Sequence, residues 1–106
     1  MNLNRITSTE TFFSQDKIKA WKVFTGKETE QILMILEPGA ILQSHTTDFD
    51  VNFLMMNGMV QLIIENESYL LEANDLAVCE GNISHGIHNN SNEISTVLIT
   101  KIFKQK

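Results

Sequence analysis

The segment PGAILQSHTTDFDVNFLMMNGMV, at residues 38–60, holds one histidine, His45, between two short apolar runs. The runs are rich in Ile, Leu, Phe and Met, and a polar TTDFD stretch separates them. Apolar runs of this length, divided by residues that favour turns, are typical of β-strands. The segment therefore predicts two strands joined by a turn, with His45 at the end of the first strand.

The rest of the chain repeats this pattern. Turn-forming stretches recur about every 8 to 12 residues, a spacing that predicts an all-β sandwich or barrel. The expected strands are short and rich in branched apolar residues: IKAWKVF (18–24), EQILMILE (30–37), AILQSH (40–45), VNFLMM (51–56), MVQLIIE (59–65), SYLLE (68–72), LAVC (76–79) and ISTVLITKIF (94–103). The segment STETFFSQ, at 8–15, is expected to form one helical turn or an irregular lead-in.

The pair Asn57 and Gly58 lies between two of these apolar runs. Asn-Gly is a preferred centre for a type I′ turn, which requires positive φ at both residues. We therefore expect a β-hairpin that joins the strand at 51–56 to the strand at 59–65.

Length and composition predict a single domain that spans residues 1–106. A chain of 106 residues has the length of one ordinary domain, and its 42% hydrophobic residues are enough for one packed core. We expect residues 18–104 to form the barrel and residues 1–17 to lead into it.

Charge and hydropathy exclude two classes of partner. A net charge of -5 disfavours nucleic acid, and the basic run KIFKQK, at 101–106, is expected to be a solvated chain end. The longest purely apolar run, at 32–36, is far shorter than the ~20 residues that cross a bilayer. The single cysteine, Cys79, favours a reducing, cytoplasmic location, and we expect it to be a buried apolar residue.

The runs ILMIL, at 32–36, and FLMM, at 53–56, are apolar at consecutive positions. Adjacent residues of a strand point to opposite faces, so each run is expected to bury both faces. One face fills the interior, and we expect the other to meet a second copy of the chain in a homodimer. The alternative, which the sequence leaves open, is that an N-terminal segment with Phe12 and Phe13 folds back over this outer face.

Histidines are the first candidates for a functional site. His45 ends the strand AILQSH, whereas His85 and His88 lie in EGNISHGIHNN, at 80–90. Residues two or four apart in a strand share a face, so His85 and Asn89 are expected to point one way and His88 the other. We expect His88 to lie at the surface.

The spacing around His45 resembles the first motif of the cupin family. That motif is Gly, five residues, His-x-His, three or four residues, Glu, six residues, Gly. In this chain Gly39, His45 and Gly58 keep the frame, while Thr47 and Val51 stand where the family has its second histidine and its glutamate.

A second group of residues resembles the other cupin motif, which is Gly, five residues, Pro-x-Gly, two residues, His, three residues, Asn. His85 and Asn89 match this motif, while Asn74, Glu80 and Asn82 stand at its first glycine, its proline and its second glycine. The resemblance implies a small double-stranded β-helix or jelly-roll barrel, in which Asn89 braces the turn after His85. Cupins include dioxygenases, isomerases and decarboxylases, so the resemblance selects no reaction.

The resemblance also implies a metal site of three histidines and a glutamate, of which His45 and His85 are present. Catalytic zinc normally takes three protein ligands, and an iron facial triad takes two histidines and a carboxylate. A metal-dependent cupin enzyme therefore needs a further ligand, for which the sequence offers Asp48 or Asp50 and the weaker oxygen of Gln43. Such a site is expected to hold Fe, Mn, Ni or Zn.

Without a metal, the same positions predict a pocket for a small molecule. Val51, Phe53 and Met55 share the face on which the family's glutamate stands, so the interior is expected to be apolar. In this hypothesis two histidines hydrogen-bond a polar group of an otherwise apolar ligand. The expected binding residues are His45, Thr47, Val51, Phe53, Met55 and His85. A third hypothesis, a scaffold or regulatory dimer with no ligand, also stays open.

Overall fold

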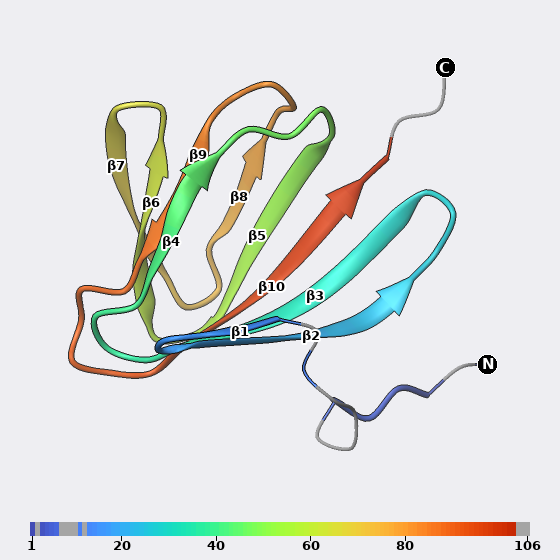
Figure 1. Ribbon diagram of the computed structural model, residues 1–106, viewed down its shortest axis with the longest axis horizontal. Helices are drawn as coiled ribbons and strands as arrows, with labels where there is room; N and C mark the ends of the chain where they lie inside the picture. The colour runs from blue at the N-terminus through green and yellow to red at the C-terminus, as the bar shows by residue number, and fades with distance from the viewer. Residues whose placement is uncertain (2, 7–10, 12, 104–106) are drawn as a thin grey trace.

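The computed structural model describes residues 1, 3–6, 11 and 13–103. This part of the chain is all β, as expected, and contains no α-helix (Figure 1). Its ten strands are β1 (Phe13–Gln15), β2 (Ile18–Thr25), β3 (Thr29–Leu36), β4 (Ile41–His45), β5 (Asp50–Asn57), β6 (Met59–Ile64), β7 (Glu67–Glu72), β8 (Leu76–Cys79), β9 (His85–His88) and β10 (Ser95–Ile102). It follows that no helix in the described residues is long and apolar enough to cross a membrane.

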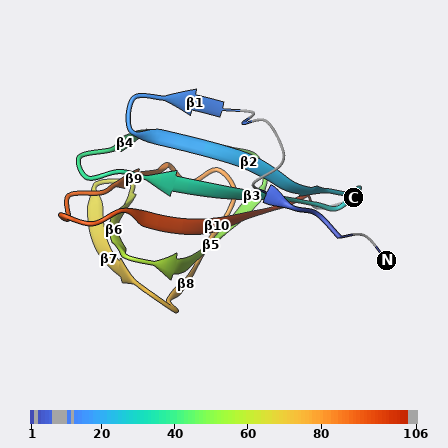
Figure 2. The same ribbon diagram turned by 90° about the horizontal axis from the view of Figure 1, so that it is seen from below.

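The strands form two antiparallel sheets that pack as the two layers of a jelly-roll barrel. The larger sheet has the order β1-β2-β3-β10-β5-β8, and Figure 2 shows it from β1 at the top to β8 at the bottom. The smaller sheet has the order β4-β9-β6-β7 and lies at the left of Figure 1. The chain passes repeatedly from one sheet to the other, so residues far apart in sequence meet in the interior.

The inner face of the larger sheet is built in rows. Paired strands place partner residues side by side, and alternation turns every second residue inward. From the deep end outward the rows on β3, β10 and β5 are Met34, Val97 and Met55, then Ile32, Ile99 and Phe53, then Glu30, Lys101 and Val51. We call these the deep row, the middle row and the mouth row. The deep and middle rows are wholly apolar and buried, whereas the mouth row carries charge.

The outer face of the same sheet carries a continuous apolar row. The register pairs Trp21 with Leu33, Leu33 with Leu98, Leu98 with Leu54, and Leu54 with Leu76. The first three of these side chains are half-buried, and the last two are exposed. Within one chain, the expectation that ILMIL and FLMM bury both faces is therefore correct only for the inner faces.

The helical turn or irregular lead-in expected at 8–15 is wrong where the structure describes it. Residues 8–10 and 12 lie outside the described part, but Phe13–Gln15 form β1, so the larger sheet begins before residue 18. Phe13 pairs with Ala20, whose side chain is buried on the inner face, and it lines the interior. The alternative in which Phe13 covers the outer face is therefore wrong, because this side chain is used inside.

The hairpin expected at Asn57 and Gly58 is also wrong. β5 pairs with β10 and β8 in the larger sheet, whereas β6 pairs with β7 and β9 in the smaller sheet. Gly58 has a φ of 79°, but Asn57 has no positive φ, so a type I′ turn does not form. The chain turns a corner between the sheets instead. A Cβ at Gly58 would lie 2.6 Å from Ser95 Oγ, which explains the glycine at this corner.

Asn89 is buried and holds three segments together. Its Nδ2 donates to the carbonyl oxygens of Leu36 and Glu93, both at 2.9 Å. Its Oδ1 accepts from the backbone N–H and the hydroxyl of Ser91, at 3.1 and 2.6 Å. Its own backbone N–H donates to Ala40 O at 2.9 Å. The brace that the family resemblance implies at Asn89 is thus present, and it fixes the connection from β9 to β10 against the end of β3.

We predict that Asn89→Ala destabilises the fold strongly. The substitution removes the donor to the buried Leu36 carbonyl, one of two donors to the Glu93 carbonyl and the acceptor of the Ser91 N–H, and a buried group left unsatisfied costs about 1–3 kcal/mol. We therefore expect urea unfolding, followed by Trp21 fluorescence, to give a free energy of unfolding about 3 kcal/mol lower. Asn90→Ala, at the exposed neighbouring position, is the matched control. A loss below about 1 kcal/mol for Asn89→Ala would contradict this role.

Candidate functional site

A cavity of about 170 Å³ lies at the mouth of the barrel, between the two sheets. Its wall is mostly apolar and consists of Phe13, Ile32, Met34, Leu42, His45, Thr47, Phe49, Val51, Phe53, His85, Ile99 and Lys101. The wall includes five of the six residues that the sequence predicts to bind a ligand: His45, Thr47, Val51, Phe53 and His85. The structure therefore brings these five together, and their role in binding stays a prediction.

Met55, the sixth predicted residue, does not line the cavity. It shares the inner face of β5 with Val51 and Phe53, as alternation predicts. However, it lies in the deep row beside Val97 and has 0% exposure. Met55 therefore belongs to the packed core beneath the cavity. Alternation identifies the face of a strand on which a residue lies, but not how deep in the barrel it lies.

A bulge in β4 turns His45 inward. The register of β4 against β9 pairs His45 with His85 but shifts between Leu42 and His45. These two residues are three apart and would point to opposite faces of a regular strand, whereas the bulge lets both line the cavity. Gly86 makes room for the bulge, because a Cβ there would lie 2.6 Å from Ser44 Oγ and 2.9 Å from Ser44 N.

The two imidazoles meet at one side of the cavity. The ring centroids of His45 and His85 lie 4.6 Å apart with an angle of 62° between the planes, and the Phe53 ring lies 5.6 Å from that of His85. Nδ1 of His45 is 3.3 Å from Gln43 O, and Nδ1 of His85 is 3.3 Å from Ile83 O. With its proton on Nδ1, each ring donates to that carbonyl and keeps Nε2 as an acceptor for a ligand.

Burial lowers the pKa of His85, a residue that is only 4% exposed. Loss of hydration of the charged ring is the main cause, and the nearby His45 lowers the pKa further, while the backbone hydrogen bond at Ile83 acts in the opposite direction. His85 is therefore a neutral imidazole near pH 7, since even an exposed histidine titrates at about 6.5.

The loop after His45 is fixed against the turn at 80–82. Thr47 Oγ1 donates to Phe49 O at 2.9 Å, and the Asn82 N–H donates to Thr47 O at 2.6 Å. Asp50 Oδ1 accepts from the Gly81 N–H at 2.9 Å. The hydroxyl proton of Thr47 and the carboxylate of Asp50 are thus both engaged in holding the loop.

This donor set does not fit the metal site that the family resemblance implies. Asp48 is exposed, Asp50 holds the turn at Gly81, and Gln43 contacts His45 through its backbone carbonyl. Across residues 1, 3–6, 11 and 13–103, no three His, Cys, Asp or Glu side chains gather where they could hold a metal ion. Two imidazoles fall short of the three protein ligands that catalytic zinc and facial-triad iron use.

Sequence reasoning missed Lys101 as a wall residue. We expect KIFKQK to be a solvated end, yet Lys101 is the last inward residue of β10, two positions after Ile99 and four after Val97. The alternation in STVLITKI carries this signal, because it continues the apolar inner face directly to a lysine. Phe13 and Phe49, which also line the cavity, stand in segments where no strand is predicted.

Two other side chains considered from the sequence lie away from the cavity wall. Cys79 is buried, as expected, and burial raises the pKa of its thiol, which makes it a poor nucleophile. His88 is half-buried, so its expected place at the surface is only partly correct. It pairs across the strands with Ile41 and Gln61, on the face of β9 opposite to His85.

We predict that His85 makes the fold sensitive to acid. Its pKa is lower in the folded protein than the value of about 6.5 in the unfolded chain, so the unfolded state binds more protons below that pH. Stability should therefore fall as the pH drops from about 7.5 to about 5.5, and His85→Gln should remove part of this loss in urea unfolding. His88→Gln is the control. An NMR titration that places the pKa of His85 at or above about 6.5 would contradict the argument.

Comparison with known proteins identifies the family. The cupin domain model Cupin_2 matches residues 32–101, whereas no curated protein matches the chain. Among solved structures, KdgF from Halomonas sp. has a TM-score of 0.86 and 15% identity over 98% of this chain and 96% of its own. The Cupin_2 domain of an XRE family transcriptional regulator from Enterobacter cloacae has a TM-score of 0.77 and 16% identity over 84% and 99%.

A cupin-superfamily sugar phosphate isomerase from Silicibacter pomeroyi has a TM-score of 0.74 and 18% identity over 84% of this chain and 61% of its own. At such identities the three structures share the fold, and their functions are their own. The family model extends from β3 to β10 and includes both histidines of the cavity. The chain therefore belongs to the cupin family.

Proposed function

We propose that this cupin binds a small molecule in the cavity at the mouth of the barrel. The observation that carries the proposal is a cavity of about 170 Å³ whose wall is apolar except for a few polar side chains on its rim and one side. A few polar groups on an apolar wall are typical of ligand sites, because the apolar area supplies affinity and the polar groups fix orientation. His45 and His85 supply the orienting groups on the side of the smaller sheet.

The volume supports a ligand with a body of about one ring. An apolar cavity of about 150 Å³ holds one benzene molecule, and the cavity of this chain is slightly larger. Phe53, Ile99 and Ile32 of the middle row form its floor, together with Met34 of the deep row. A ring or a branched chain of similar size fills this space and leaves a polar substituent at the level of the imidazoles.

A metal-dependent cupin enzyme is the alternative, and nothing in the donor set favours it over simple binding. His45 and His85 remain from the family's ligands, but Thr47, Asp48 and Asp50 do not complete the set. The similar structures include both an isomerase and a regulator domain, so they support neither role over the other. A ligand-free scaffold is the third possibility, which a failure of all ligand binding would favour.

We predict that one-ring compounds, charged or uncharged, bind the open cavity of the wild type and do not bind a variant in which a larger side chain fills the cavity. Benzamide, benzoate and benzylamine are the probes, and at least one of them should raise the thermal midpoint of the wild-type protein. Val51→Phe should abolish this effect, because the larger side chain occupies the cavity from the mouth row. Ile94→Phe, at a position that is 53% exposed outside the cavity, should bind as the wild type does.

Two results of this experiment would reject the proposal. If no probe binds the wild type, or if Val51→Phe binds as well as the wild type, the cavity is not the site. Metal analysis of the same protein, purified without a histidine tag, tests the alternative. Near-stoichiometric metal that disappears in His45→Ala and His85→Ala would favour the metal-dependent cupin instead.

We also propose that two copies of the chain pair through the outer face of the larger sheet. The outward residues within 31–35, 52–56, 76–78 and 96–100 include no charged side chain, although 20% of the chain is charged. Depletion of charge is a mark of interface cores. The rim of this face carries Lys19 and Asp50, and Asn52 within it has a buried Oδ1 without a hydrogen-bond partner.

A second copy of the chain fits this face because it presents the same uncharged surface. Each copy then covers uncharged side chains with uncharged side chains. Two copies with a net charge of -5 each repel elsewhere, but this face adds no repulsion. A twofold axis through Leu54 and Leu98 would pack the apolar row of one copy on the same row of the other.

We predict a concentration-dependent dimer. Light scattering after gel filtration should give a mass twice the 12.0 kDa of one chain. Leu54→Glu should shift the mass to that of one chain, because it places two like charges in the interface. Leu70→Glu, at a similarly exposed site on β7 of the other sheet, is the matched control. A wild-type mass of 12.0 kDa at every concentration would rule out the dimer.

A further inference from the structure

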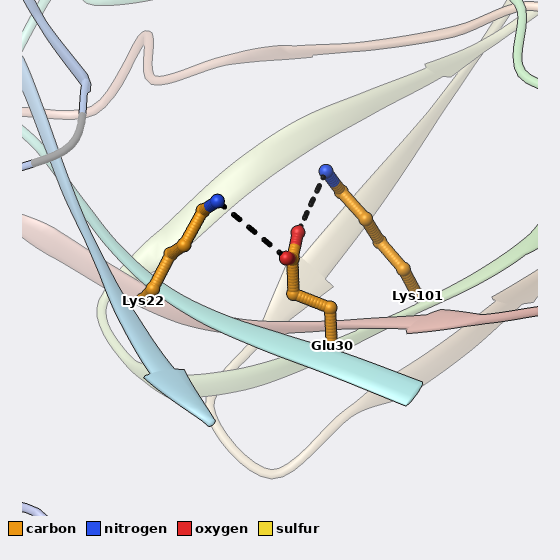
Figure 3. Close-up of polar contacts among 3 residues, drawn as sticks. All are labelled: Lys22, Glu30 and Lys101. Carbon is orange, nitrogen blue, oxygen red and sulfur yellow. Dashed lines mark hydrogen bonds and ion pairs between the residues drawn. The ribbon is translucent and has the colours of Figure 1, made fainter. Parts of the chain in front are cut away.

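Three charged side chains stand together at the mouth of the barrel. Lys22 of β2, Glu30 of β3 and Lys101 of β10 come from adjacent strands, on the inward side of the alternation. Figure 3 shows both amines turned toward the one carboxylate: Lys101 Nζ lies 3.2 Å from Oε1, and Lys22 Nζ lies 3.6 Å from Oε2. Two positive charges share one negative charge, so these three side chains together carry one positive charge, on a chain whose net charge is -5.

Lys101 brings this positive charge to the cavity. Among the described residues of the wall it is the only Lys, Arg, Asp or Glu. Its partner across the strands is Val51, which also lines the cavity, and its Nζ lies 5.8 Å from the centroid of the Phe49 ring. The side chain is 30% exposed, so the ammonium stands where the apolar wall meets water.

Glu30 and Lys22 determine how strongly the positive charge of Lys101 acts on a ligand in the cavity. The carboxylate of Glu30 is 13% exposed and is held between the two amines. An ion pair formed by Glu30 and Lys101 alone would have no net charge. Lys22 offsets the negative charge from the other side, which leaves Lys101 able to attract a second anion.

The wall below Lys101 restricts the polarity of the part of the ligand that lies inside the cavity. Ile99, Ile32 and Phe53 of the middle row are buried and apolar, so a group that enters past the ammonium loses its contact with water. An extended polar molecule such as a sugar would leave its hydroxyls without partners on this floor. A body without polar groups, joined to one anionic group, matches both the floor and the mouth.

We propose that the cavity selects small monocarboxylates, with an apolar body of about one ring on the middle row and the carboxylate paired with Lys101. This inference rests on the proposed function, because it names the class of ligand for the same cavity. The carboxylate, planar and singly charged, receives a charge-assisted hydrogen bond from the ammonium. The imidazoles of His45 and His85 stand on the other sheet and accept a hydrogen bond from a donor on the far side of the ring.

Three probes of the same shape test the selection by charge. Benzoate, benzamide and benzylamine share one ring and carry a negative charge, no charge and a positive charge. Isothermal titration of the full chain at neutral pH should give a Kd for benzoate about tenfold lower than that for benzamide, with benzylamine the weakest. Added NaCl should reduce the difference between benzoate and benzamide, because salt screens the pairing with Lys101.

Substitutions in the charged cluster should change benzoate binding in opposite directions. Lys101→Met keeps an apolar side chain of similar length, so benzoate should lose its advantage while the Kd for benzamide stays within about twofold. Lys22→Gln should weaken benzoate binding, and Glu30→Gln should strengthen it. Lys19→Gln, which removes an exposed lysine from the outer side of β2, controls for overall charge. A purely structural role of the cluster predicts weaker binding of all probes in all three variants.

The outcomes separate this inference from the proposed function. Benzamide or benzylamine binding as tightly as benzoate would overturn the selection for carboxylates and leave the cavity as a binding site. Glu30→Gln weakening benzoate in a protein that keeps its thermal midpoint would also overturn it. If none of the three probes binds, both the inference and the proposed function are wrong.

Discussion

The register of β10 between β3 and β5 determines what lies at each depth of the barrel. Val97, Ile99 and Lys101 point inward in succession, and each aligns with one residue on either side. A shift by one residue would turn all three outward, and a shift by two would pair Lys101 with residues of another row. The order from apolar core through apolar cavity floor to charged mouth therefore follows from the register of this one strand. The proposed ligand class depends on the same register.

Much of the fold follows from local patterns in the chain. The apolar segments with turn residues between them predict nearly every strand, because alternation and turn chemistry act over a few residues. The spacing of Gly39, His45, Gly58, His85 and Asn89 also predicts the barrel. Asn89 shows why spacing is informative: its position in the chain is fixed by hydrogen bonds to two other segments.

The features that sequence reasoning missed depend on contacts between distant segments. Whether Asn57 and Gly58 form a hairpin depends on which strands lie beside β5 and β6, and the close approach of Ser95 favours a corner. His45 faces the cavity through a bulge that needs the missing side chain of Gly86 opposite it. No periodicity within β4 shows such a bulge.

The depth of a side chain is equally invisible in a linear pattern. Met55 and Val51 have the same parity on one strand, yet one is core and the other lines the cavity. The alternation of β10 is enough to predict that Lys101 points inward. The charge around Lys101, however, depends on Glu30 and Lys22, which come from two other strands. Strand alternation can therefore locate a candidate wall, whereas the neighbours across the sheet decide what the wall attracts.

Thr47 and Val51 occupy the two positions at which the chain departs from the family's metal ligands, and both still line the same cavity as His45 and His85. The framework that would present four ligands has been kept, since the loop holding Thr47 is fixed by Asn82 and Val51 remains an inward residue of β5. Two replacements in one motif therefore separate the side chains of this wall from the ligand set that the family resemblance implies. The route from the present wall to that ligand set is short in mutational terms.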